Sequence, residues 1–162
     1  MIALNKEKFS LLELIKSLNR VLIELTTDEK FVTGWFGLYS HDTHRLSSIN
    51  AGHNTIFLFR KDHEMISLTQ GGIFLGSLDL EYSIEEITLE KNDIVVCYTD
   101  GVPEALNASG GFYTEERLIE YVKNNIGIDS ESILKGIYDD VSKFVNGFEQ
   151  SDDITCGVIT VL

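Results

Sequence analysis

Few cysteines and few basic residues limit what this protein can be. Cys97 and Cys156 are the only cysteines among 162 residues, and both lie inside apolar runs, so they are expected to be small core residues. A disulfide framework is therefore not expected, and a reducing cytoplasm is the expected location. Lys and Arg total 13 against 26 Asp and Glu, which gives a formal net charge of −13. Nucleic acids and anionic membranes attract cationic proteins, so neither is an expected partner.

Long apolar runs and several well-known catalytic motifs are also absent. No run reaches the roughly 18 apolar residues of a transmembrane helix, and no signal-peptide pattern opens the chain. The glycines at 71, 72 and 76 are not followed by the Gly-Lys-Ser/Thr of a nucleotide-binding loop. The histidines in the polar turns have no His or Cys partner at zinc spacing, and no Ser or Cys nucleophile motif stands out. These absences argue against a membrane-spanning, P-loop or zinc protein.

The remaining pattern predicts a single α+β domain over residues 1–162, long enough for a hydrophobic core. Leu and Ile recur at helical spacing over residues 9–26. Short β-branched and aromatic runs separated by polar turns follow, which indicates successive antiparallel hairpins. Thr114, and Asp129 or Ser130, are the expected N-caps of two later helices. The expected strands are 31–40, 45–50, 55–60, 65–68, 80–89, 94–99 and 154–161, with a glycine-rich loop at 70–77 and helices at 114–126 and 130–146.

Two short acidic motifs adjoin the two most apolar strands. Asp100 and Gly101 follow the apolar run at 94–98, and Asp152 and Asp153 precede the last run of the chain. A carboxylate at the end of a buried strand is costly unless a cation or hydrogen-bond donors meet it. If the two strand ends lie together, Asp100 and Asp152 converge on one site for Mg²⁺ or Mn²⁺. Such ions activate water for attack on phosphate.

Each of these features also has a purely structural interpretation. Asp-Gly is a common turn dipeptide, and the Asp152-Asp153 pair can cap a solvated strand end. Glu104 would add an outer carboxylate to the site, or would simply be solvated. A histidine such as His53 is a candidate general acid near neutral pH. The favoured interpretation is that His53 and Asn54 hold a hairpin loop by hydrogen bonds.

Five motifs occur in a characteristic order. They are Phe31-Val32-Thr33, Asn50-Ala51-Gly52-His53-Asn54, Gly72-Ile73-Phe74-Leu75-Gly76, Tyr98-Thr99-Asp100-Gly101-Val102-Pro103-Glu104-Ala105 and Ser151-Asp152-Asp153-Ile154-Thr155. Over roughly residues 9–162 this order resembles the PPM-type metal-dependent serine/threonine phosphatases, in the bacterial branch of SpoIIE-like and sigma-factor regulators. Pro103 stands where a Thr is usual in that motif. The resemblance implies an antiparallel β-sandwich flanked by helices.

The same resemblance implies a catalytic site. Asp100 and Asp152 would ligate one of two Mn²⁺ or Mg²⁺ ions, and no side chain would act as the nucleophile. A water that bridges the ions would attack phosphoserine or phosphothreonine directly. The residues implied around these ligands are Asp153, Gly101 and Glu104, with His53 and Asn54 in a nearby loop. The expected partner is a phosphorylated bacterial signalling protein, such as an anti-sigma-factor antagonist.

One part of the family pattern has no counterpart in this sequence. The Asp-Val-x-Gly-x-Gly motif, whose Asp bridges both metals in the family, matches nothing in residues 1–30. The sequence therefore predicts an N-terminally incomplete phosphatase domain, either a truncated segment or a natural remnant. Its open sheet edges would favour a homodimer. The alternative function is a non-catalytic pseudophosphatase or fragment that binds a regulatory protein.

Overall fold

The computed structural model describes residues 10–25, 30–150 and 152–162. The chain divides into two compact units, Met1–Thr55 with Leu68–Leu89, and Ile56–Ser67 with Glu90–Leu162. Two four-stranded sheets and three helices make up the described structure, which confirms the expected α+β class. Residues 9, 26 and 151, which belong to an expected helix or to a motif, lie outside the described residues.

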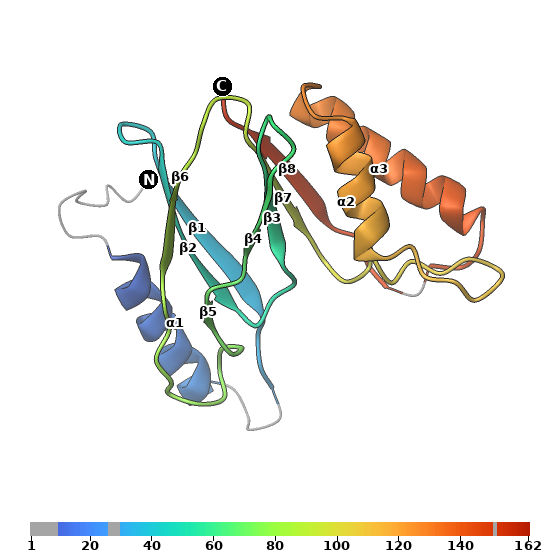
Figure 1. Ribbon diagram of the computed structural model, residues 1–162. Helices are drawn as coiled ribbons and strands as arrows, with labels where there is room; N and C mark the ends of the chain where they lie inside the picture. The colour runs from blue at the N-terminus through green and yellow to red at the C-terminus, as the bar shows by residue number, and fades with distance from the viewer. Residues whose placement is uncertain (1–9, 26–29, 151) are drawn as a thin grey trace. The chain divides into compact units, whose positions relative to one another are not determined.

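In the first unit, helix α1 (Leu11–Leu25) packs against a sheet built on strand β2 (Arg45–Ala51) (Figure 1). Strands β1 (Gly34–Ser40) and β6 (Glu85–Thr88) both pair with β2 in antiparallel register. The short strand β5 (Gly71–Gly72) pairs with β2 in parallel. The antiparallel hairpin of β1 and β2 was expected from the sequence, and the parallel pair was not.

The core of the first unit forms between α1 and β2. Ile15 is fully buried and packs with Ile49, because the apolar side chains of α1 lie on one face of the helix. Asn19, one turn further on, is fully buried too. Its Nδ2 donates to the Leu78 carbonyl at 2.9 Å, and its Oδ1 accepts from the Gly76 amide at 2.8 Å. One polar side chain therefore holds the segment 76–78 against α1.

The prediction of a plain loop over residues 70–77 was wrong in part. That segment contains β5, and Leu75 forms an antiparallel bridge with Val32. A side chain at Gly71 would overlap the backbone of Asn50, so the glycine lets β5 lie close to β2. In the sequence, the same glycines look like a loop. The strand expected at 80–89 is likewise shorter, since only Glu85–Thr88 pairs with β2.

The second unit is a sheet with two helices on one face (Figure 1). In spatial order its strands are β4 (Met65–Leu68), β3 (Ile56–Phe59), β7 (Ile94–Tyr98) and β8 (Cys156–Thr160). The helices are α2 (Glu115–Asn124) and α3 (Ser130–Val145). Strand β7 is antiparallel to both of its neighbours. These elements agree with the expected ones to within a few residues at each end.

The core of the second unit lies between this sheet and the two helices. Val96 and Tyr98 of β7 pack with Leu118 of α2 and with Ile137 of α3. All residues of β7 except Cys97 are buried, as its continuous apolar run predicts. Strand β7 is therefore a fixed platform for the residues that follow it.

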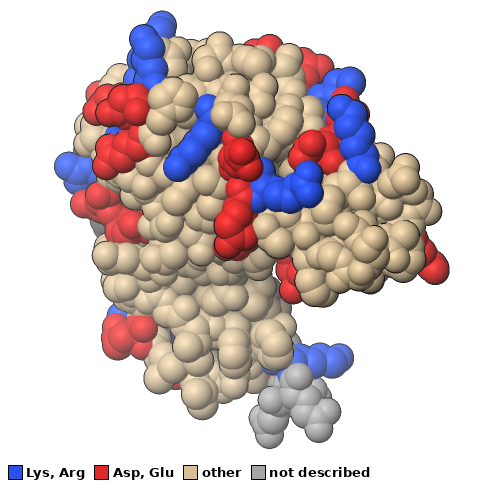
Figure 2. Space-filling view, turned by 45° about the vertical axis from the view of Figure 1, so that its right-hand side comes forward, with Lys and Arg blue, Asp and Glu red and all other residues tan. Residues whose placement is uncertain are grey.

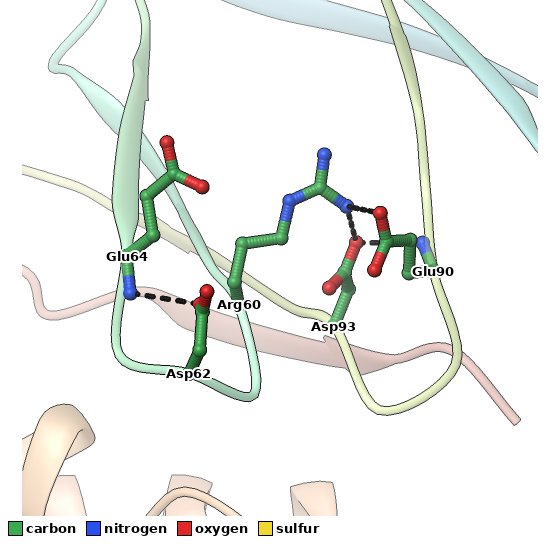
Figure 3. Close-up of polar contacts among 5 residues, drawn as sticks. All are labelled: Arg60, Asp62, Glu64, Glu90 and Asp93. Atoms are coloured by element: carbon green, nitrogen blue, oxygen red, sulfur yellow. Dashed lines mark hydrogen bonds and ion pairs between the residues drawn. The ribbon is translucent and has the colours of Figure 1, made fainter.

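A buried ion pair anchors the start of β7 (Figure 3). The Asp93 carboxylate, 1% exposed, accepts hydrogen bonds from the Arg60 guanidinium and, at 2.7 Å, from the Glu90 amide. Burial raises the pKa of Asp93, against the opposing effect of these donors. A cavity of about 460 Å³ lies beside the pair, lined by Arg60, Lys61, Asp62, Glu64 and Glu90. It adjoins the start of β7, whereas Asp100 follows the other end.

Charged side chains of both signs are mixed on one face of the protein. Figure 2 shows Asp and Glu next to Lys and Arg on the face drawn, with uncharged residues between them. On that face the net charge of −13 is not gathered into one acidic field. Among the described helices, none combines the length and the apolar character that crossing a membrane requires.

Candidate metal site

The end of β7 and the approach to β8 meet in the second unit. Tyr98 is paired with Cys156, and the contact continues beyond the two strands. The Thr99 amide donates to the Thr155 carbonyl at 3.0 Å, and the Thr155 amide donates to Thr99 Oγ1 at 3.0 Å. The two acidic motifs, which are far apart in sequence, therefore begin at one point of the sheet.

Gly101 brings the two motifs into direct backbone contact. It is buried, and an added Cβ atom would overlap the Asp153 carbonyl oxygen and lie 2.9 Å from the carbonyl carbon. The Thr99 hydroxyl also donates to the Asp153 carbonyl at 3.3 Å. The first motif can lie this close to the second because residue 101 has no side chain.

The two carboxylates expected as metal ligands lie at this junction and are exposed to solvent. Asp100 Oδ1 accepts from the Gly101 amide at 3.0 Å, and Asp152 Oδ1 accepts from the Asp153 amide at 2.7 Å. Each carboxylate is thus oriented by a main-chain donor through one oxygen and can offer its second oxygen to a cation. In the described ranges, no three or more His, Cys, Asp or Glu side chains gather closely enough to hold a metal ion.

The other residues expected around the ligands contribute in different ways. Asp153 is exposed, and its backbone carbonyl makes the contacts with Thr99 and Gly101. The Glu104 amide donates to the Asp100 carbonyl at 2.9 Å, which closes the turn after β7, while the Glu104 side chain is exposed. The main chain of Glu104 therefore shapes the loop, and its carboxylate lies on the surface.

Two buried tyrosines tie the segment around Asp100 to the helices, a role that the sequence did not indicate. The Tyr98 hydroxyl donates to the Glu115 carboxylate at the start of α2. The Tyr113 hydroxyl donates to Asp140 Oδ2 at 2.6 Å. Burial is the main reason why the pKa of both tyrosines is raised. The position of Tyr98 at the end of the apolar run, two residues before Asp100, is the local signal that could have indicated this role.

The loop with His53 and Asn54 is held by another residue than expected. The Asn50 side chain accepts from the His53 amide at 2.8 Å and donates to the Asn54 carbonyl at 3.2 Å. The loop is held by hydrogen bonds, but the side chain that makes them is the buried Asn50, and His53 and Asn54 contribute their backbone groups. His53 and Asn54 belong to the first unit and Asp100 to the second, so their proximity to the metal site stays a prediction.

Comparison with known proteins is consistent with this arrangement. The family described as Stage II sporulation protein E (SpoIIE) matches residues 1–162. Phosphoserine phosphatase RsbU of Bacillus subtilis (strain 168) is 30% identical over 149 residues, which are 91% of this chain and 44% of RsbU. The chain spans less than half the length of the curated relatives that it matches.

Solved structures show the same fold at low sequence identity. The SiaA-PP2C domain of Pseudomonas aeruginosa has a TM-score of 0.78 at 13% identity, covering 89% of this chain and 58% of that one. The catalytic domain of the serine threonine protein phosphatase PstP, in complex with 2 manganese ions, has a TM-score of 0.67 at 12% identity, covering 98% and 76%. With its whole length matched by the family and its fold that of PP2C domains, the chain belongs to the SpoIIE family of PPM-type phosphatase domains.

Proposed function

We propose that this chain is a metal-dependent protein phosphatase domain that hydrolyses phosphoserine or phosphothreonine. The observation that carries the proposal is the junction of the two acidic motifs, where Gly101 contacts the backbone of Asp153. The pairing of β7 with β8 fixes this junction, so Asp100 and Asp152 start from one place in the fold. Membership of the SpoIIE family supports the same activity.

The donor set at the junction fits a hard divalent cation. Carboxylate oxygens are the ligands that Mg²⁺ and Mn²⁺ prefer, and both Asp100 and Asp152 are exposed enough to be reached. PstP, which has the same fold, was solved with manganese. Mn²⁺ or Mg²⁺ is therefore the proposed cofactor, held by Asp100 and Asp152. When bound, it would supply the activated water and the positive charge that phosphate hydrolysis requires.

The residues of the chain would orient and stabilise this site. The Gly101 and Asp153 amides hold one oxygen of each ligand carboxylate, so the second oxygen has a defined direction. The hydrogen bond from Tyr98 to Glu115 ties the end of β7 to the start of α2. Hydrolysis by water needs no nucleophilic side chain, in agreement with the absence of a Ser or Cys motif from the sequence.

The finer parts of the proposal concern substrate and location. RsbU is described as a phosphoserine phosphatase, which supports a phosphoserine protein as the substrate here. A bacterial signalling protein such as an anti-sigma-factor antagonist is the proposed example. Two free cysteines are consistent with the proposed cytoplasmic location.

Hydrolysis of p-nitrophenyl phosphate tests the activity without a protein substrate. Turnover should require Mn²⁺ and should fall by more than roughly a hundredfold in Asp100→Asn and Asp152→Asn, since even residues that only orient metal ligands are worth up to that factor. Asp42→Asn is the control, because Asp42 is an exposed carboxylate in the turn between β1 and β2. A folded chain without Mn²⁺-dependent turnover would instead support the alternative, a non-catalytic binding module.

A further inference from the structure

An apolar cavity of about 300 Å³ lies next to the junction of the acidic motifs, within the second unit. Its apolar lining comes from the loop after β7, from the last turns of α3 and from the approach to β8. These residues are Ala105, Leu106, Val141, Val145, Phe148 and Ile154. The volume is at the lower end of the roughly 300–1,000 Å³ of ligand pockets, so it suits one large side chain.

Two residues that line the cavity directly follow the acidic motifs in sequence. Ala105 directly follows Glu104 of the first motif, and Ile154 directly follows Asp153 of the second. The Tyr138 hydroxyl donates to the Ile154 carbonyl at 3.0 Å, which ties α3 to the second motif. A side chain seated in the cavity would therefore lie beside residues that adjoin both acidic motifs.

Part of the lining is uncovered apolar surface. Phe148 is 42% exposed and Tyr138 is 47% exposed, although both line the cavity. Contiguous exposed apolar surface rimmed by polar residues marks binding surfaces, and these two side chains lie at one cavity. The uncovered wall favours an apolar occupant.

The charges around the cavity favour a basic partner. Five residues next in sequence to a lining residue are acidic, but Asp139 pairs with Lys135 and Asp140 accepts from Tyr113. The remaining three acids stand against one cation, Lys143. These three acids are Glu104, Glu149 and Asp153, and all are exposed. Complementary charge steers partners toward such a surface and selects among them.

We propose that this cavity receives one apolar side chain of the phosphoprotein substrate, from a segment that also carries Lys or Arg. The apolar residue lies a short distance along the chain from the phosphorylated residue, so the cavity sets which phosphorylated sites are accepted. This inference rests on the proposed phosphatase function and adds a class of substrate sequence to it.

Peptide binding without added metal tests the inference separately from turnover. The probes are fluorescein-labelled phosphoserine peptides on a serine and lysine background, with a single leucine moved through the positions on either side of the phosphoserine. Fluorescence anisotropy should show one leucine position that binds about tenfold more tightly than the leucine-free peptide, as expected for one buried apolar side chain.

Two variants of the cavity complete the test. Ser142 lines the cavity, is exposed, and lies outside the proposed metal site, so Ser142→Trp should fill the cavity and abolish the leucine preference. Ser142→Ala is the matched control, because it keeps the cavity open. Phe148→Ser removes part of the exposed wall and should weaken the preference even if the tryptophan variant folds poorly.

The outcomes separate the inference from the proposed function. A leucine preference that Ser142→Trp abolishes, with unchanged hydrolysis of p-nitrophenyl phosphate, supports both. Hydrolysis without any leucine preference, or a preference that both cavity variants retain, overturns the inference and leaves the function in place. A preference that depends on the cavity, in a protein without Mn²⁺-dependent hydrolysis, supports the docking of an apolar side chain and overturns the phosphatase function.

Discussion

Gly101 is the residue on which the junction of the two acidic motifs depends most directly. In Gly101→Ala the new methyl group would overlap the Asp153 carbonyl, so the ends of β7 and β8 would have to separate. We expect the free energy of unfolding to fall by about 1–3 kcal/mol, the usual cost of overpacking a tight contact. Urea denaturation measures this difference.

Gly157 is the control for that substitution. It lies in β8, on the other side of the junction, and an added Cβ atom there has no heavy atom within 4 Å. Gly157→Ala should therefore leave stability unchanged or raise it by about 0.5 kcal/mol, because alanine loses less backbone freedom on folding. Equal losses in the two variants would mean that Gly101 has no special role in the junction.

At the residue scale, a side chain could be predicted to matter where the neighbouring residues form a recognisable pattern. The convergence of the Asp100 and Asp152 motifs could be predicted because each adjoins a strongly apolar strand, and the structure confirms that these strand ends meet. Their role as metal ligands stays a prediction. Asn19 and Asn50 could not be predicted, since an asparagine that holds distant or neighbouring backbone groups looks like any polar residue in one sequence.

At the scale of elements, the two C-terminal helices begin in different ways. The Asp129 side chain accepts from the Ser132 amide at 2.9 Å, which is an N-cap of α3 as the sequence predicts. Thr114 precedes α2 but makes no capping hydrogen bond through its side chain, and its backbone has φ 72° and ψ 157°. Few residues other than glycine adopt that conformation.

This difference predicts opposite effects of substitution at the two helix starts. Asp129→Ala should lower the free energy of unfolding by about 1 kcal/mol, because it removes the cap. Thr114→Gly should raise it by about 1 kcal/mol, because it relieves backbone strain. Thermal unfolding of both variants checks the signs, and a destabilised Thr114→Gly protein would show that the side chain is needed there.

The long elements could be predicted from the sequence, and the short ones could not. Helix α1 and strand β7 each carry an unbroken periodic or apolar pattern, which local sequence determines. Strand β5 has two glycines and pairs with β2 in parallel, so nothing in its own residues indicates a strand. Its position is set by its pairing with β2.

At the scale of the whole molecule, stability should fall in alkaline solution. Burial raises the pKa of the Cys97 and Cys156 thiols from 9.0 to about 11. The unfolded thiols lose their protons first, so stability is complete below pH 9.0 and is lost as the pH rises toward 11. The loss is roughly 1–2 kcal/mol for each thiol, because both are partly exposed. The buried tyrosines Tyr98 and Tyr113 act in the same direction.

Urea unfolding midpoints measured across this pH range check that expectation. The Cys97→Ala/Cys156→Ala double variant should be less stable at neutral pH, since it loses buried volume, but its stability should depend less on pH. A double variant with the full alkaline loss would assign the effect to other groups.

Binding of Mn²⁺ tests the central claim most directly, namely that Asp100 and Asp152 belong to one metal site. Titration of the chain with Mn²⁺, followed by the electron paramagnetic resonance signal of the free ion, reports binding without any need for turnover. We expect the wild-type chain to bind Mn²⁺, and Asp100→Asn and Asp152→Asn each to lose the same binding event. The double variant should then bind Mn²⁺ no more weakly than either single variant. Wild-type binding in both single variants, or losses that add in the double variant, would contradict a shared site.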